Sequence, residues 1–218
     1  MKNIPRIFIG KNIKNGTTIP VDKSVSHYLS HVMRRRDCLV FGDGNEYVAE
    51  LSADGKSLVV GEKTEHTDPS NDITLYFAPI KRVDDMLNMA TQMGVGKFVP
   101  VITERTVANH INWERMKKIV TEAAEQSNRN TVPDIASPIK FADLPFADLV
   151  FADERAAYGR KLPNDYKNVK NILVGPEGGF ADAEFDALDK NGARGISLGK
   201  TILRAELAAP IAISRVIQ

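Results

Sequence analysis

Several features that would point to particular classes of protein are missing from this chain. Among its 218 residues there is a single cysteine, Cys38, so the chain can form neither an intrachain disulfide nor a cysteine-based metal site. No apolar run approaches the roughly 18–20 residues that span a bilayer. The start, Met1 to Arg6, lacks the apolar centre of a signal peptide. We therefore expect a soluble, cytoplasmic protein with no membrane partner.

Charge of one sign is also missing. The 29 basic and 28 acidic residues give a net charge of +1, which by itself predicts neither a nucleic-acid nor a membrane partner. The sequence is 43% apolar and 26% charged, a balance that supports a packed core and excludes a disordered or fibrous chain.

Familiar cofactor motifs are absent as well. No strand is followed by G-x-G-x-x-G, so a Rossmann dinucleotide site has no support. The segment Gly195–Thr201 resembles a phosphate-binding P-loop, but three residues separate its glycines where that motif needs four. His27 and His31 are four residues apart on an expected helix without a third ligand nearby, so surface or packing roles are favoured. We predict no metal site.

The segment 61–72 has no large apolar residue and is predicted to be a surface linker. We place the domain boundary there, with one domain at 1–68 and a second at 69–218. The first is predicted to be a small, mostly β module with one helix at about 25–35. Asp43-Gly44 between two of its strands is a hairpin signal.

The predicted elements of the second domain follow a different order, in which strands alternate with helices. This alternation is typical of a parallel α/β sheet. The final helix is predicted near 208–217, starting around Pro210, because proline is tolerated in a first turn. The expected strands are 73–78, 98–102, 149–152, 172–174 and 195–198, and the expected helices before the last are 82–93, 113–126 and 182–190.

Two glycine bends follow strands of this domain. The strand Ile172–Val174 runs into Gly175-Pro-Glu-Gly-Gly179, where glycine allows a ligand to touch the main chain. Ligands of parallel sheets collect at the carboxyl ends of strands, which favours a binding site here. A tight turn without a ligand is the plain alternative. The second bend, 197–206, has Arg204 and Glu206 before an apolar helix, a pattern that a surface ion pair would also explain.

Taken together, the bends make the chain similar to a known family. Gly175-Pro-Glu-Gly-Gly179 followed by Leu198-Gly-x-x-Ile-Leu-Arg-x-Glu206 resembles the ribosomal RNA small subunit methyltransferase E family of the SPOUT class. The resemblance implies an S-adenosylmethionine-dependent enzyme that methylates N3 of a specific uridine in small-subunit (16S) ribosomal RNA. It also implies a PUA-like β-barrel RNA-binding domain at 1–68, an α/β domain with a trefoil knot at 69–218, and a homodimer.

Site residues are implied by the same resemblance. Arg204 would stabilise negative charge on the uridine or hold a phosphate, and Glu206 would orient Arg204 or accept a proton. The cofactor S-adenosylmethionine would be held by main-chain groups and an apolar wall. The residues expected to bind it are Val174, Gly175, Glu177, Gly178, Gly179, Leu198, Gly199, Ile202 and Leu203.

The expected partner is small-subunit ribosomal RNA or the assembled small subunit. Phosphate contacts dominate RNA affinity, so clustered cations are the candidates for RNA binding. The densest run is Arg34-Arg35-Arg36, which a solvated helix end would also explain. The further candidates are Arg6, Lys81, Arg82, Arg105 and Arg129.

Three residues depart from the family pattern. Met89, Gln92 and Leu207 stand where its members usually carry Lys, Glu and Thr. These departures keep open an alternative reading as a non-catalytic RNA-binding or ribosome-assembly protein of the same fold. A SPOUT methyltransferase that acts on another RNA, such as transfer RNA, is the other alternative.

Overall fold

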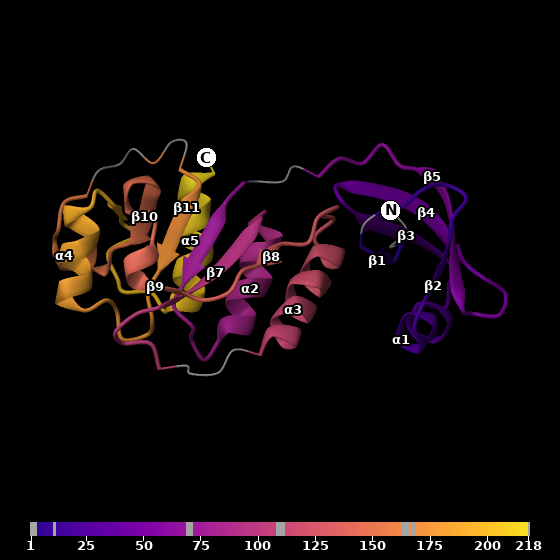
Figure 1. Ribbon diagram of the computed structural model, residues 1–218, viewed down its shortest axis with the longest axis horizontal. Helices are drawn as coiled ribbons and strands as arrows, with labels where there is room; N and C mark the ends of the chain where they lie inside the picture. The colour runs from indigo at the N-terminus through magenta and orange to yellow at the C-terminus, as the bar shows by residue number, and fades with distance from the viewer. Residues whose placement is uncertain are drawn as a thin grey trace. The chain divides into compact units, whose positions relative to one another are not determined.

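The computed structural model describes residues 4–10, 12–68, 72–107, 112–162, 166 and 169–217 (Figure 1). The chain forms two compact units. The first comprises 1–70 and 121–132, and the second comprises 71–120 and 133–218. Helix α3 (Trp113–Gln126) therefore starts in the second unit and ends in the first. Residues 121–132 therefore return to the first unit, which a division of the sequence into two contiguous domains does not allow.

In the first unit, the described residues form a five-stranded sheet in the order β1-β3-β4-β5-β2, in which β1 runs parallel to β3 and the other pairs are antiparallel. The predicted hairpin is confirmed, because Asp43 and Gly44 both have positive φ (52° and 78°) between β3 and β4. The strands are β1 (Arg6–Phe8), β2 (Thr18–Pro20), β3 (Asp37–Gly42), β4 (Asn45–Leu51) and β5 (Ser57–Lys63).

Two boundaries in this unit differ from expectation. The predicted helix is an α-helical turn, α1 (Lys23–His27), that continues as a π-helical segment, η1 (Tyr28–Val32). Strand β5 extends to Lys63, into the segment predicted as a linker. Lys63 pairs with Tyr47 of β4, and main-chain pairing of this kind needs no apolar side chain, so composition alone gave the wrong end.

The second unit contains the predicted parallel sheet. Its described strands run in the order β12-β10-β11-β6-β7-β8, with β9 beside the end of β7, and the pairs between these strands are all parallel. The strands are β6 (Thr74–Phe77), β7 (Lys97–Ile102), β8 (Asp134–Ile135), β9 (Ile139–Lys140), β10 (Leu149–Ala152), β11 (Asn171–Val174) and β12 (Arg194–Ile196).

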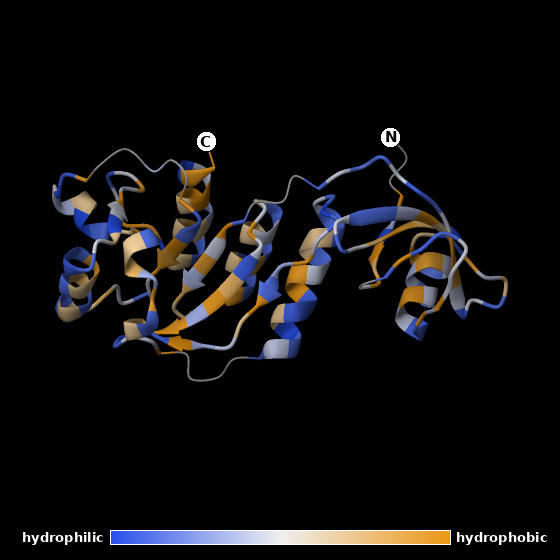
Figure 2. Ribbon diagram, turned by 45° about the horizontal axis from the view of Figure 1, so that its top comes forward, coloured by the Kyte–Doolittle hydropathy of each residue, from blue (hydrophilic) through white to orange (hydrophobic). Residues whose placement is uncertain are grey.

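The central strands are apolar along their length, as Figure 2 shows in orange, and Leu149, Phe151, Ile172 and Leu173 are fully buried. Such runs are typical of parallel strands covered on both faces. The helices of this unit are α2 (Val83–Gln92), α3, α4 (Asp182–Lys190) and α5 (Ala205–Val216), with short 3-10 turns η2 (Phe141–Asp143), η3 (Phe146–Asp148) and η4 (Glu154–Tyr158).

The start of α5 corrects a sequence prediction. The helix begins at Ala205, so Pro210 lies in its interior rather than in its first turn. Arg204 is extended (φ −65°, ψ 150°), and its carbonyl accepts from the Leu207 and Ala208 N–H groups, which fixes the helix start. Proline costs the helix one main-chain hydrogen bond. Burial of Ala209 and the rest of this apolar helix offsets that loss.

Within the described part of the chain, none of the helices combines the length and apolarity that crossing a membrane would require. The described His, Cys, Asp and Glu side chains likewise form no group of three or more placed to hold a metal ion.

Candidate cofactor pocket

The two glycine bends meet at one pocket in the second unit. The carboxyl end of β11 contributes Val174–Glu177, and the bend between β12 and α5 contributes Leu198, Gly199 and residues 201–206. The cavity has a volume of about 440 Å³, which suits a small-molecule ligand. Other lining residues come from α2's start, from the end of β10, from η4, from the turn before α4 and from α5, namely Arg82, Ala152, Asp153, Glu154, Ala157, Phe180 and Ala208.

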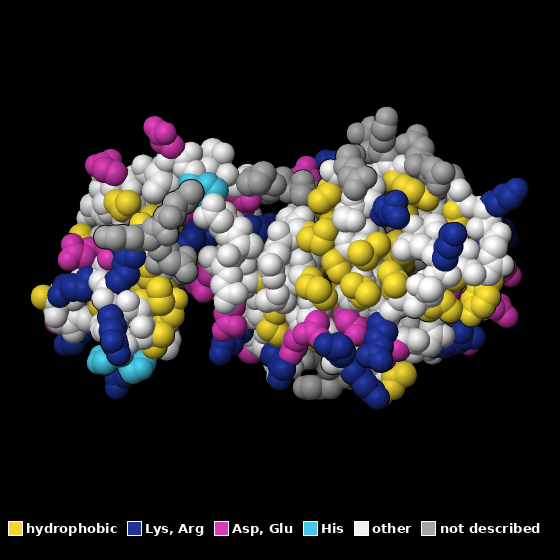
Figure 3. All heavy atoms as spheres, turned by 180° about the vertical axis from the view of Figure 1, so that it is seen from behind, with side chains coloured by type: hydrophobic (Ala, Val, Ile, Leu, Met, Phe, Trp, Pro, Cys, Tyr) yellow, Lys and Arg dark blue, Asp and Glu magenta, His cyan; other side chains and the backbone are white. Residues whose placement is uncertain are grey.

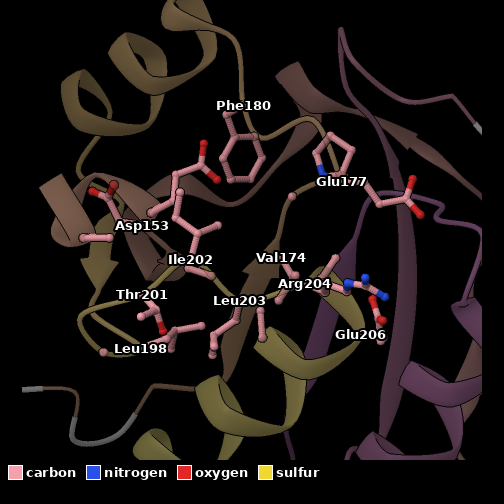
Figure 4. Close-up of a pocket in the computed structure, with 18 of the residues that line it drawn as sticks. Asp153, Val174, Glu177, Phe180, Leu198, Thr201, Ile202, Leu203, Arg204 and Glu206 are labelled. Atoms are coloured by element: carbon pink, nitrogen blue, oxygen red, sulfur yellow. The ribbon is translucent and has the colours of Figure 1, made fainter.

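Apolar side chains form one wall of this pocket. Leu198, Ile202 and Leu203 project from the bend before α5, and Val174 lies at the end of β11 (Figure 4). Ile202 is 55% exposed, so its apolar side chain is open to contact with a ligand in the pocket. The wall can therefore accept a flat heterocycle, with main-chain groups of the bends beside it.

Glycine is required at two places in this wall. Gly199 has φ +137°, a conformation that other residues rarely adopt. A Cβ at Gly175 would lie 3.0 Å from the Phe180 ring, so glycine lets that ring pack against the strand end. Both positions keep main chain, rather than side chain, at the pocket surface.

Gly178 and Gly179 shape the turn but do not line the described pocket. Gly179 has φ +70°, and a Cβ there would lie 2.9 Å from the carboxyl carbon of Glu154. The Arg105 guanidinium holds the same turn, since its Nη1 donates to the carbonyls of Gly178 (3.0 Å) and Phe180 (3.1 Å). The structure thus shows a conformational role for this turn, and direct contact of Gly178 and Gly179 with the cofactor stays a prediction.

Glu184 is a residue of the site region that sequence reasoning missed. Its buried carboxylate accepts from the Glu104 N–H (2.9 Å) and from the Ala181 N–H (2.9 Å). It thereby ties the chain after β7 to the start of α4, directly after the glycine turn. The sequence did contain a signal for this role, because an acidic residue in the first turn of a predicted helix is typical of a residue that caps the helix start.

The side chains of Arg204 and Glu206 lie at one end of the pocket, and Asp153 lies at the other (Figure 4). Arg204 is exposed, and its guanidinium makes no hydrogen bond or ion pair with any described residue. Glu206 is buried and accepts from Arg82 Nη1 at 3.2 Å. The expectation that Glu206 orients Arg204 is therefore wrong: its partner is Arg82, which also pairs with Asp85.

A second hollow adjoins the first and shares Arg82, Arg204 and Glu206 with it. Its remaining wall consists of Asp85, Asn88, Met89 and Leu207. The Asn88 side-chain oxygen accepts from Gln92 at 2.6 Å, so all three departures from the family pattern lie in or beside this hollow. The two hollows offer room for two ligands side by side.

Comparison with known proteins agrees with this geometry. A family model described as RNA methyltransferase domain matches residues 67–217. Ribosomal RNA small subunit methyltransferase E from Rickettsia conorii is 34% identical, with 97% of this chain and 94% of the relative covered. The same-named protein of Aquifex aeolicus is 28% identical over 95% of this chain and 97% of its own. The chain belongs to this family.

Solved structures show the same family resemblance. Ribosomal RNA small subunit methyltransferase E from Neisseria gonorrhoeae, bound to S-adenosyl methionine, matches with a TM-score of 0.82 at 27% identity, covering 97% of this chain and 96% of that one. A probable rRNA-methyltransferase from Porphyromonas gingivalis matches with a TM-score of 0.80 at 25% identity, covering 98% and 97%. The structural match thus covers nearly the whole chain, including the α/β fold with its parallel sheet in the second unit.

Two acidic residues of this family member were missed by sequence reasoning. Asp153 and Glu154 follow β10 at the pocket, so the strand-end rule applied to β11 could have found them. Asp153 is buried and accepts from Arg155 Nε and Nη2, both at 2.8 Å. Burial and the neighbouring Asp153 raise the pKa of Glu154, although Arg105 and Arg155 oppose the rise.

Two of the RNA-binding candidates need correction. Arg6 is ion-paired with Glu46 at 2.8 Å, donates to Asn130 at 2.7 Å and lies over the Phe41 ring. Arg129 is only 4% exposed and lies 4.0 Å from Asp68. Both guanidiniums are used inside the first unit of this methyltransferase-family protein. They are therefore not available to bind phosphates.

The remaining candidates lie at the surface. Arg34 and Arg36 are exposed, whereas Arg35 is half-buried and pairs with Asp37. The run lines a hollow in the first unit with Ser30, Ser52 and Gly55, among others. In the second unit Lys81, Arg82 and Arg105 are exposed, although Arg82 and Arg105 also hold the contacts described above.

Proposed function

We propose that this protein transfers a methyl group from S-adenosylmethionine to N3 of a specific uridine in small-subunit (16S) ribosomal RNA. The observation that carries the proposal is the convergence of the bends at 174–177 and 198–206 on one apolar-walled pocket. Membership in the family and the S-adenosyl methionine bound to the Neisseria relative support the same ligand here. A ribosomal substrate would place the protein in the cytoplasm.

The pocket fits this cofactor by its donor chemistry. Main chain at Gly175 and Gly199 is accessible to the edge of an adenine ring, and Leu198, Ile202 and Leu203 supply its apolar cover. Glu177 and Val174 complete the side formed by β11. When bound, S-adenosylmethionine supplies a methyl group activated by an adjoining sulfonium.

The chain's own residues would position and activate the acceptor. The second hollow, next to the cofactor pocket, is the place for the uracil ring, and alignment there would supply much of the rate enhancement. Loss of the N3 proton leaves a uracil anion, which a cation nearby stabilises. Arg204 borders both hollows with an uncommitted guanidinium and is assigned this role.

Glu206 is assigned a positioning role. Its carboxylate is buried against Arg82, and the ion pair joins the starts of α2 and α5 in the wall of both hollows. A buried carboxylate that loses its partner is costly, so the pair is expected to hold as a unit. The proton acceptor in the reaction is then solvent or a group of the substrate.

RNA binding is assigned to the exposed cations. Arg34 and Arg36 of the first unit, with half-buried Arg35, would contact phosphates, as would Lys81 and Arg105 of the second. On this proposal, residues 1–68 act as a PUA-like barrel domain that binds RNA, and residues 69–218 act as the methyltransferase domain. The substrate is naked small-subunit RNA or the assembled subunit.

The knot and the dimer are further parts of the proposal. We propose that the bend before α5 belongs to a trefoil knot of the SPOUT type, which would hold the two glycine bends together. Leu207 of helix α5 is 45% exposed, and Ile217, which follows the helix, is 44% exposed. Figure 3 shows hydrophobic side chains gathered on a face of the second unit. An exposed apolar face of this kind favours a homodimer.

Mass spectrometry of ribosomal RNA tests the function. Small-subunit RNA from cells that lack the protein should lose one N3-methyluridine, and the wild-type gene should restore it. Unchanged small-subunit RNA with a modification lost from transfer RNA would support the other-RNA alternative. Calorimetry that finds RNA binding without S-adenosylmethionine binding would support the non-catalytic alternative, which Met89 and Leu207 in the second hollow favour.

A further inference from the structure

The carboxylates that line the cofactor pocket differ in their partners. Asp153 is paired with Arg155, and Glu206 with Arg82. Glu177 accepts from the Lys81 N–H at 3.2 Å. Glu154, in contrast, has neither a hydrogen bond nor an ion pair with the residues that the structure describes, although Arg105 and Arg155 lie near enough to affect it. It is the lining carboxylate whose charge is least compensated.

The fold makes room for this carboxylate at the pocket. Glu154 begins η4 directly after β10, and it is half-buried. The absence of a side chain at Gly179 leaves the space that the Glu154 carboxyl group fills. Burying a charge without a partner costs free energy, and a ligand that brings a positive charge would offset this cost.

The uncommitted cation of the pocket, Arg204, does not compensate the Glu154 carboxylate. Arg204 lies at the end of the pocket away from Asp153, the residue next to Glu154 (Figure 4). The pocket is therefore polarised, with an unpaired carboxylate on the β10 side and an unpaired guanidinium on the α5 side. Arg204 does not neutralise Glu154 directly.

We infer that Glu154 makes the pocket selective for the positively charged methyl donor over the neutral thioether product. This inference rests on the proposed function. The sulfonium and thioether forms of the cofactor share the same adenosine and amino-acid groups, and they differ in the methyl group and one positive charge. A carboxylate facing the cavity favours the charged form and assists release of the product after transfer.

Calorimetry with S-adenosylmethionine and S-adenosylhomocysteine tests this selectivity by the ratio of the two dissociation constants. The variant Glu154→Gln should weaken S-adenosylmethionine binding roughly tenfold and leave S-adenosylhomocysteine binding within about twofold. Glu154→Asp, which keeps the charge, should retain most of the selectivity. Asp186→Asn removes an exposed carboxylate of α4 outside the pocket and should leave both constants unchanged.

The outcomes separate this inference from the proposed function. An equal loss for both ligands in Glu154→Gln would mean that the side chain binds a shared group, and no loss would mean that it binds neither; each result overturns the selectivity. Failure of the wild-type protein to bind either ligand would instead refute the proposed function itself. Thermal denaturation confirms that each variant is folded, and Glu154→Ala provides a second neutral variant.

Discussion

The charged residues at the pocket differ in whether they already have a hydrogen-bond or ion-pair partner within the protein. Arg82, Arg105 and Arg155 each hold a carboxylate or a carbonyl, whereas the Arg204 guanidinium has no such partner in the described part of the chain. A cation that stabilises no native contact can be removed without loss of folding energy. Its position beside two hollows therefore supports the proposal that Arg204 acts on a substrate.

The variant Arg204→Ala tests this assignment. We expect methylation to fall by roughly 10²-fold or more, because the charge that develops on the uracil is left without its cation. S-adenosylmethionine affinity and the thermal midpoint should stay within error of wild type. Turnover is measured with tritiated cofactor on small-subunit RNA, and near-normal turnover would remove Arg204 from the mechanism.

Glu154 predicts a dependence of stability on pH with a definite sign. Its pKa in the folded protein is raised above the ordinary value of a glutamate side chain, chiefly by burial. A raised folded pKa means that the stability contribution of this group is present at acid pH and is lost as pH rises through that pKa. The ionised side chain therefore disfavours the ligand-free fold at neutral pH.

Glu154→Gln should accordingly match or exceed the thermal midpoint of the ligand-free wild-type protein at pH 7. The difference should shrink toward zero as the pH is lowered to about 4, where the wild-type carboxyl group becomes neutral. Differential scanning calorimetry at several pH values measures it. A large drop in the midpoint at pH 7 would show that Glu154 supports the fold instead of the ligand.

Among the elements, the turn between β11 and α4 depends on contacts from far along the chain. Arg105 holds its carbonyls, and Glu184 fixes the start of α4 while reaching back to the chain after β7. The glycines allow the main chain of the turn to adopt many conformations, and the hydrogen bonds of these two charged side chains hold it in one of them. The geometry of the cofactor pocket depends on both.

Loss of the Glu184 carboxylate should therefore affect stability and binding together. Glu184→Ala leaves two main-chain N–H groups without their acceptor, and we expect a loss of about 1–3 kcal/mol in the free energy of unfolding. Glu184→Gln keeps one acceptor oxygen and should lose less. Urea denaturation measures the loss of stability, and calorimetry measures the expected weaker binding of S-adenosylmethionine. Unchanged stability in Glu184→Ala would contradict the proposal that Glu184 holds the chain after β7 to the start of α4.

On the scale of the whole molecule, the near-zero net charge conceals an uneven distribution of usable cations. Arg6 and Arg129 are nearly buried against internal partners, whereas Arg34 and Arg36 are exposed on the first unit. Arg36 also lies 3.6 Å from the exposed carboxylate of Glu50. We propose that RNA affinity depends on the exposed cations, because phosphate binding releases counterions only where the charge reaches the surface.

RNA binding should thus weaken steeply with salt, and Arg34→Gln should reduce the slope of log affinity against log salt by about 1. Lys190→Gln, which removes an exposed cation of α4, should leave the slope unchanged. Filter binding between 50 and 200 mM salt measures this slope. Several phosphate contacts weaken RNA binding about 10³-fold over this range of salt. A flat salt response of the wild-type protein would exclude this arginine run.

The sequence alone determined the parts of this protein that are local. Apolar runs and their spacing predicted the parallel sheet and the limits of α3, α4 and β10, and the glycine bends indicated where a ligand would lie, since each depends on neighbours along the chain. Only the tertiary structure decided which charges are free. Glu206 and Arg82, or Arg6 and Asn130, are 124 residues apart, and pairing over such distances depends on how the chain packs.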